Sequence, residues 1–341
     1  MGIKSNFNKF LQKKCGSDVF VDTHISDFRF KKIAIDTSLY LFRYKAGMGD
    51  RWLSGFISLI SLFRRNHVHC VFILDGKSPE EKKDEQKRRK DDRIKKDDLV
   101  SSYETDLVNY YSTGVVSEQL ATFVTKQKID IKDAEDSIRK KRDQVVCIGQ
   151  VDFDLLKTLF GIMNIPYYTA PSEAEKFCCK LCVDGLVDAV LSNDTDCLVY
   201  AAPVVLSKLN VSTGVCCRIY NKTLMESMAV TNEQFLDLCI LCGTDYNKNI
   251  ASIGSATAYK YIQTHGTIEN IRDAKSIDIT SLNHVRVREL FATFDDYDMS
   301  HVPYCGKPNF KELYSFVIEN KVQMSIDSFK TCFTNDDLIF V

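Results

Sequence analysis

Short apolar runs alternate with helical patterns over the first two hundred residues of the chain. The runs Lys32–Asp36, His69–Asp75 and Ala189–Ser192 are continuous and rich in Ile, Val and Leu, as is typical of buried strands. Trp52–Arg65 and Val151–Met163 carry apolar residues at helical spacing. Strands that alternate with helices predict the α/β class, with a central, mostly parallel sheet flanked by helices.

Weaker patterns complete this picture and change towards the C-terminus. Before Asn232 we expect two helices and two extended segments, at Asn6–Lys14, Thr37–Tyr44, Ile165–Thr169 and Cys216–Tyr220. After it the patterns are helical, at Phe235–Cys242, Ser255–Thr264, Phe310–Glu319 and Ser325–Cys332. We therefore expect an α/β core over residues 1–228 and a helical region over residues 229–341.

The segment 77–142 differs from its surroundings. Residues 77–96 contain ten Lys and Arg against six Asp and Glu, and the segment shows no clear apolar face. Such a pattern favours exposed helices inserted between strands over part of the sheet.

Composition narrows the functional classes only slightly. The net charge of −1 gives no overall signature of nucleic-acid binding, so any such binding depends on local patches. No apolar run approaches the ~20 residues that a membrane span needs, and we expect no membrane partner. Of the 13 cysteines, Cys179/Cys182 and Cys239/Cys242 form CxxC pairs that could bind zinc. Both pairs lie in apolar helical runs, which favours buried free thiols and an intracellular protein.

Seven acidic residues form the most informative pattern. Three of them, Asp36, Asp75 and Asp194, fall at the C-terminal ends of predicted parallel strands, and ligands bind at that edge of an open α/β sheet. The others are Glu173, Glu175, Asp196 and Asp245. Taken singly they have ordinary explanations: Asp194 can cap a turn, Asp75-Gly76 is a turn dipeptide, and Ser172 with Glu175 matches a capping box. Taken together, carboxylates on one edge require cations, and oxygen ligands suit Mg²⁺ or Mn²⁺.

Glu173 and Glu175 stand only two residues apart. On a regular helix they would point to opposite sides, so they can share a site only if the helix begins beside them and its first turn is irregular.

A second pattern lies after Asp245. Ile253-Gly254 precedes the predicted helix Ser255–Thr264, and another predicted helix ends before it. Glycine lets a main chain approach a phosphate, and the following helix offers free N–H groups.

Several long motifs give the chain a family resemblance. They are MGI at the N-terminus, IAIDTSLYLFRY, VFILDGKSPEEKKDEQKRR, IPYYTAPSEAEKFCCKL, LSNDTDCLVY and CILCGTDYNKNIASIG. In order and spacing the sequence resembles the flap endonucleases, structure-specific 5′-nucleases of cells and large DNA viruses, up to about residue 270. The resemblance implies two Mg²⁺ ions, replaceable by Mn²⁺. Asp36, Asp75, Glu173, Glu175 and Asp194 would favour one ion, and Asp194, Asp196 and Asp245 the other.

The resemblance also implies roles for residues outside the acids. Lys82 and Arg89, two helical turns apart, match the basic positions that contact the scissile phosphate. Phe42 matches an aromatic that stacks on a base near the cut, although a core position is the alternative. Segment 77–142 corresponds to a helical arch through which a single-stranded 5′ end threads. DNA contacts are implied for Gly2, Ile253, Gly254 and Lys260.

Two departures from the family bear on partners. Ser252 and Asn249 replace small residues of the hairpin after Asp245, where the family binds a monovalent cation such as K⁺. Gln323–Phe329 matches only in part the family's sliding-clamp-binding peptide, because Lys330 replaces its second aromatic, and no basic tail follows. Clamp binding therefore stays open.

The resemblance predicts Mg²⁺-dependent cleavage of DNA at a junction with a 5′ single-stranded flap, in replication, repair or recombination. It implies a monomer that acts in the nucleus or a viral replication compartment. The alternatives are a Holliday-junction resolvase or 5′ exonuclease of the same superfamily, an RNA-directed nuclease, and a DNA-binding scaffold without catalysis.

Overall fold

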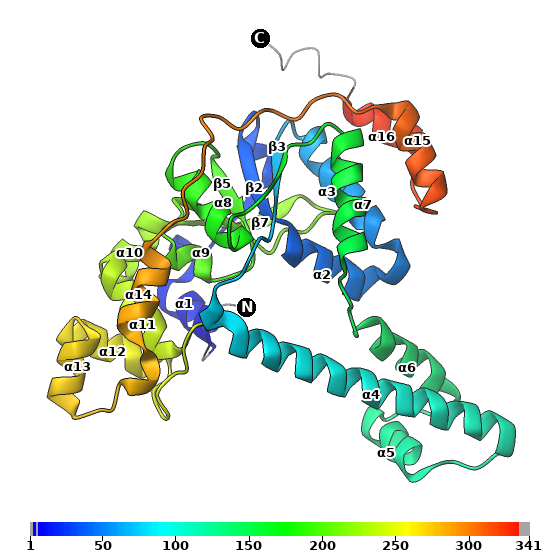
Figure 1. The fold of residues 1–341 in the computed structure, drawn as a ribbon, viewed down its shortest axis with the longest axis horizontal. Helices are drawn as coiled ribbons and strands as arrows, with labels where there is room; N and C mark the ends of the chain where they lie inside the picture. Colours follow the sequence, from blue (N-terminus) through cyan, green and yellow to red (C-terminus); the bar gives the residue numbers. More distant parts are fainter. Residues whose placement is uncertain (1–2, 5, 334–341) are drawn as a thin grey trace.

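A seven-stranded mixed sheet forms the centre of the protein, whose computed structural model describes residues 3–4 and 6–333 (Figure 1). The strand order is β1-β7-β6-β5-β2-β3-β4, and the five strands from β6 to β4 run parallel. β7 pairs antiparallel with both β6 and β1. The strands are β1 (Val21–His24), β2 (Lys32–Asp36), β3 (His69–Leu74), β4 (Tyr167–Thr169), β5 (Ala189–Leu191), β6 (Val204–Ser207) and β7 (Val215–Tyr220). The predicted α/β sheet is confirmed, while β1 and β6 were not expected.

Helices cover both faces of the sheet because the strands are apolar on both sides. Ile33 and Ile35 of β2 join one buried cluster, and Ala34 between them joins another. Burying an Ile side chain contributes roughly 1.5–3 kcal/mol, so both faces stabilise the sheet. The helices of the Ile33 face are α2 (Thr37–Met48), α3 (Trp52–Arg65), α7 (Gln150–Ile162), α15 (Phe310–Glu319) and α16 (Ile326–Lys330).

The helices of the opposite face share one apolar cluster, which continues past residue 229 without a break. The predicted α/β core and the predicted helical region therefore share one continuous apolar cluster and are not separated at residue 229. These helices are α1 (Phe7–Cys15), α8 (Ala174–Val183), α9 (Asp196–Val199), α10 (Asn221–Met228), α11 (Asn232–Cys242), α12 (Ser255–His265), α13 (Ile268–Lys275) and α14 (His284–Ala292).

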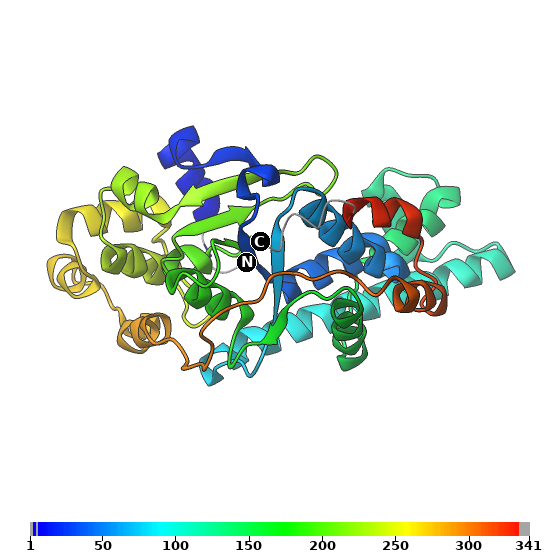
Figure 2. The same cartoon turned by 90° about the horizontal axis from the view of Figure 1, so that it is seen from above.

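Segment 77–142 projects from the carboxyl edge of the sheet as α4 (Lys83–Thr113), with α5 (Glu118–Gln127) and α6 (Ala134–Asp143) packed along its far half. Figures 1 and 2 place α5 and α13 at opposite ends of the molecule. The expectation that segment 77–142 has no clear apolar face was wrong. A small cluster holds the three helices together, with Val100, Leu107, Leu120, Phe123, Ala134 and Ile138 buried.

The cysteines of both CxxC pairs are buried free thiols, as predicted. Along the described chain, no helix is both long and apolar enough to cross a membrane.

Candidate active site

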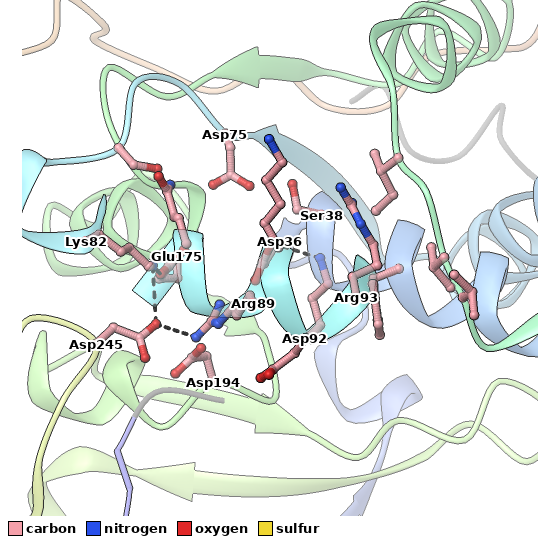
Figure 3. A pocket seen from close by; sticks show the side chains of 18 of the residues that line it. Asp36, Ser38, Asp75, Lys82, Arg89, Asp92, Arg93, Glu175, Asp194 and Asp245 are labelled. Atoms are coloured by element: carbon pink, nitrogen blue, oxygen red, sulfur yellow. Dashed lines mark hydrogen bonds and ion pairs between the residues drawn. The ribbon is translucent and has the colours of Figure 1, made fainter. Parts of the chain in front are cut away.

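A cavity of about 610 Å³ opens where the parallel strands end and α4 begins. Its wall combines acids from distant parts of the chain with basic residues of α4 (Figure 3). The acids that line it are Asp36, Asp75, Glu175, Asp194 and Asp245, together with Asp92 of α4.

The three acids at the carboxyl ends of strands each use one oxygen to accept a backbone N–H at the start of a helix. Asp36 Oδ1 accepts the Leu39 N–H of α2 at 3.3 Å, and Asp194 Oδ1 accepts the Asp196 N–H at 3.0 Å. Asp75 Oδ1 accepts the first N–H of α8, from Ala174, at 2.9 Å. Such bonds satisfy backbone donors that a helix leaves open. Capping a turn and lining the cavity are therefore compatible roles for Asp194, since the oxygen that accepts the N–H fixes the carboxylate beside the cavity.

Gly76 explains how Asp75 reaches α8. A Cβ atom at this position would lie 2.0 Å from the Ala170 carbonyl oxygen, and the Gly76 N–H donates to the Ser172 carbonyl at 2.7 Å. Only glycine permits this close approach of two backbones.

The capping box predicted for Ser172 and Glu175 is wrong. Helix α8 begins at Ala174, its cap comes from Asp75, and the Ser172 hydroxyl donates instead to Asp295. Glu173 precedes the helix in an extended conformation, with φ −95° and ψ 138°. The irregular start places both glutamates beside the Lys82 ammonium, so Glu175 has no capping role to explain its position.

Lys82 and Arg89 are the internal counterions of the acids. Lys82 Nζ pairs with Glu173, lies 3.5 Å from Glu175 Oε1, and lies 3.6 Å from Asp245 Oδ2. Arg89 Nη2 donates to the same Asp245 oxygen at 2.7 Å, and its Nε donates to Glu85 Oε1 at 2.9 Å. Figure 3 shows both cations converging on Asp245. The seven-residue spacing thus brings them together, although Lys82 lies in the 3-10 turn Glu80–Lys82 just before α4.

The acids remain poorly balanced despite these two cations. Burial first, and then the charge of Asp75, raises the pKa of Asp36 to about 7. Burial, with the charges of Asp194 and Asp245, raises the pKa of Asp196 far above its ordinary value. Burial also raises the pKa of Glu175. The Lys82 ammonium lowers this pKa, but the charges of the nearby acids raise it further, so the shift is only partly offset.

These residues fit added cations. Buried Asp196 Oδ1 has no hydrogen-bond partner within the described residues. Among residues 3–4 and 6–333, no three His, Cys, Asp or Glu side chains are close enough together to coordinate a metal ion in their present conformations. The Lys82 ammonium lies among three acids instead, which shows that this space accepts positive charge. Hard carboxylate oxygens favour Mg²⁺ or Mn²⁺ over softer ions.

Sequence reasoning missed two supporting residues. Glu85, buried in α4, accepts from both Arg88 and Arg89 and orients the latter. Tyr246 donates its hydroxyl hydrogen to Glu173 and lies 3.2 Å from the Tyr200 hydroxyl. Its place next to Asp245 was the available signal, but an aromatic residue beside an acid predicts a core position equally well.

Phe42 lies on the rim of the cavity and is 48% exposed, whereas its neighbours Tyr40 and Tyr44 are buried. This excludes the core alternative that the sequence left open. An exposed aromatic face beside the carboxylates is available for stacking.

The predicted hairpin is formed by α11, the turn after it, and α12. Ile253 is buried, and Gly254 precedes α12 with open space where a Cβ would stand. Ser252, in place of the family's glycine, adopts a left-handed φ of 68°. Lys260 is exposed on α12, and Gly2 lies outside the described residues.

Comparison with known proteins identifies the family of the chain. The family model of the XPG N-terminal domain matches residues 1–96, and that of the XPG I-region matches residues 164–245. The probable RAD2-like endonuclease 369L of Invertebrate iridescent virus 6 is 32% identical over 89% of this chain and 81% of its own. Flap endonuclease 1 of Cryptosporidium parvum (strain Iowa II) is 27% identical over 94% of this chain and 67% of its own.

Two solved structures share the fold. The catalytic core of Rad2 in complex with DNA substrate aligns with a TM-score of 0.69 at 16% identity, over 97% of this chain and 99% of its own. Human GEN1 in complex with Holliday junction DNA aligns with a TM-score of 0.64 at 18% identity, over 98% of this chain and 76% of its own. The chain belongs to the XPG family of structure-specific DNA nucleases, which includes the flap endonucleases.

Proposed function

We propose that this protein is a 5′ flap endonuclease that hydrolyses DNA phosphodiester bonds where single-stranded and duplex DNA meet. The observation that carries the proposal is the cluster of buried acids facing Lys82 and Arg89 at the base of α4. A site that pairs excess carboxylates with a lysine and an arginine suits a phosphate substrate that arrives with divalent metal. Replication, repair and recombination all use this reaction.

Mg²⁺ is the proposed cofactor, and the seven acids are its proposed ligands. When bound, it supplies Lewis-acid activation of the attacking water and of the phosphate. The acids that would hold it are Asp36, Asp75, Glu173, Glu175, Asp194, Asp196 and Asp245.

Lys82 and Arg89 have a second role in this proposal. In the structure they neutralise Glu173, Glu175 and Asp245, which divalent ions would neutralise when bound. The two side chains are then released towards the scissile phosphate, where they stabilise the charge that develops during cleavage. Hydrolysis of the bond between phosphorus and the 3′ oxygen leaves a 5′-phosphate and a 3′-hydroxyl.

DNA is positioned by contacts that do not depend on base sequence. Phe42 stacks on a base beside the cut, and the 5′ end passes along the basic face of α4. The backbone around Ile253 and Gly254, with Lys260, binds duplex phosphate. Ser252 has a left-handed φ, a conformation that glycine adopts readily, and this supports a K⁺ site at the carbonyls of the turn. Binding should therefore weaken strongly as salt rises.

Clamp binding through Gln323–Phe329 receives little support. Phe329 is buried in the apolar cluster with α3 and α15, so it is not exposed for a partner.

Parallel cleavage of 5′ flap, nicked, gapped and four-way-junction DNA in Mg²⁺ tests the proposal. We expect the flap to be cut fastest, and Asp194→Asn to bind flap DNA normally while losing at least about 10³-fold in rate. Asp18→Asn, an exposed acid that does not line the cavity, serves as the matched control and should cut normally. Normal cutting by Asp194→Asn would overturn the metal assignment, and preferred cutting of the four-way junction would identify a resolvase instead.

A further inference from the structure

The two oxygens of Glu173 are held by two different side chains. Oε1 pairs with Lys82, and Oε2 accepts the hydroxyl hydrogen of Tyr246. The Glu173 side chain is only 2% exposed, so solvent does not compete for either oxygen. The carboxylate is therefore divided between a cation on its open side and a phenol on its buried side.

The direction of these hydrogen bonds follows from chemistry. An ionised carboxylate only accepts, so the Tyr246 hydrogen is committed to Glu173. The Tyr200 oxygen lies 3.2 Å from the Tyr246 oxygen, and Tyr200 must then donate its own hydrogen to Tyr246. Burial raises the pKa of both phenols, which keeps them protonated as donors. The chain from Tyr200 through Tyr246 to Glu173 is thus polarised in one direction.

The two tyrosine rings are held by the C-terminal half of the molecule. Phe291 of α14 lies 4.9 Å from the ring of Tyr200 and 5.3 Å from that of Tyr246, between ring centroids. Phe294 lies 5.9 Å from Tyr200. All three aromatic side chains in the Phe291 contact are nearly buried, so the Tyr246 hydroxyl has a fixed position.

Tyr246 differs from Lys82 in what it can do during turnover. Lys82 is a long side chain that leaves Glu173 if it moves to a phosphate. The Tyr246 phenol is rigid and packed, so it keeps Oε2 when Lys82 has left. The oxygen that Lys82 releases is then Oε1, on the side of the other acids.

We propose that Tyr246, supported by Tyr200, is a positioning residue that holds Glu173 so that Oε1 alone is presented to metal. This inference rests on the proposed metal-dependent function, and it assigns one further residue to that site. Hydrogen bonds to a ligating carboxylate fix its orientation and influence metal affinity.

Direct Mn²⁺ binding without DNA tests the inference, measured by electron paramagnetic resonance and calorimetry on the full chain. Tyr246→Phe removes only the hydroxyl, and we expect its Mn²⁺ dissociation constant to rise about tenfold. Tyr200→Phe should show a smaller loss in the same direction. Tyr297→Phe is the matched control, because its hydroxyl also donates to a carboxylate, that of Asp184, away from the cavity. It should bind Mn²⁺ as the wild type does.

Two further readouts separate positioning from a general structural effect. Flap-DNA affinity of Tyr246→Phe in EDTA should equal that of the wild type, and high Mn²⁺ should restore its kcat. Wild-type Mn²⁺ affinity in Tyr246→Phe would overturn the inference. So would a loss of DNA affinity in EDTA as large as the loss of Mn²⁺ affinity in that variant. If the wild type binds Mn²⁺ and Tyr246→Phe binds it weakly, yet the wild type leaves flaps uncut, the proposed function fails while the inference stands. A wild type that binds no Mn²⁺ overturns both.

Discussion

Two clusters of acids in this molecule are balanced in opposite ways. Between α11, α13 and α14, Arg288 donates to Asp237 at 2.6 and 2.7 Å and to Glu269 at 2.6 and 2.9 Å. The Arg288 hydrogen bond lowers the pKa of Glu269 to about 2. His284 adds a contact to Glu269 at 3.0 Å. This cluster is satisfied by its own side chains and joins three helices.

The cluster at the sheet edge has a surplus of acids instead. Lys82 and Arg89 pair with Glu173, Glu175 and Asp245, while the pKa of Asp36 in the same cluster rises to about 7 and that of Glu269 falls. The difference teaches how to separate structural acids from functional ones. Acids that stabilise the fold find matched cations, whereas a buried surplus is tolerated only where function supplies the missing charge.

Removing Lys82 should produce the largest change. Lys82→Ala should lower flap cleavage about 10²–10³-fold, because a cation that stabilises developing charge is lost. Single-turnover cleavage in Mg²⁺ measures it. Lys83→Ala, an exposed neighbour paired only with Glu80 in the described structure, should cut normally. Equal rates for the two variants would contradict the assignment of Lys82.

Removing the cation of the balanced cluster should affect stability instead. Arg288→Ala leaves buried Asp237 without its main partner and should lower the free energy of unfolding by about 3 kcal/mol. Arg286→Ala, on the same helix but half exposed, should cost much less, because solvent screens an exposed ion pair. Urea unfolding compares them. A similar cost for both would show that burial does not distinguish the two pairs.

Neutralising one acid in each cluster should change stability in opposite directions. In EDTA, Asp196→Asn should raise the free energy of unfolding by about 1 kcal/mol, since it removes an unfavourable buried charge. Asp237→Asn should lower it, because Arg288 and the Ile268 N–H lose a charged acceptor. Stabilisation should come with loss of cleavage in Asp196→Asn. The same sign in both variants would remove the distinction between the clusters.

The pH dependence of stability should also differ between the clusters. Asp36, with a folded pKa near 7 against about 3.9 unfolded, holds more protons when folded, so its contribution to metal-free stability falls as pH rises from about 4 to 7. Glu269, with a folded pKa of about 2, contributes stability above about 4.3 that is lost as pH falls towards 2. Urea midpoints in EDTA for wild type and Asp36→Asn measure the first effect. Parallel pH curves for the two proteins would be evidence against it.

The sequence predicted the sheet and its acidic edge because both depend on local patterns. Continuous apolar runs located β2, β3 and β5, and acids at the ends of strands meet at one edge in a parallel sheet. The phosphate-contact roles of Lys82 and Arg89 were predicted from the family resemblance alone. The run of charged residues in segment 77–142 does not distinguish them from their neighbours.

What could not be predicted depends on contacts between distant residues. Helix α8 is capped by Asp75, 99 residues before Ala174, so the local capping-box pattern misled. Tyr246 meets Glu173 across 73 residues. Strands β1 and β6 are four residues each and are stabilised by their pairing with β7.

Counting Mn²⁺ ions in crystals tests the central claim, that the acid surplus at the sheet edge is balanced by divalent metal. Anomalous scattering from crystals soaked in Mn²⁺ would locate each ion directly. We predict two ions between Asp36 and Asp245, with the Lys82 ammonium displaced from Glu175. Crystals in which Mn²⁺ leaves this edge empty, while Lys82 keeps its pairing with the acids, would contradict the account.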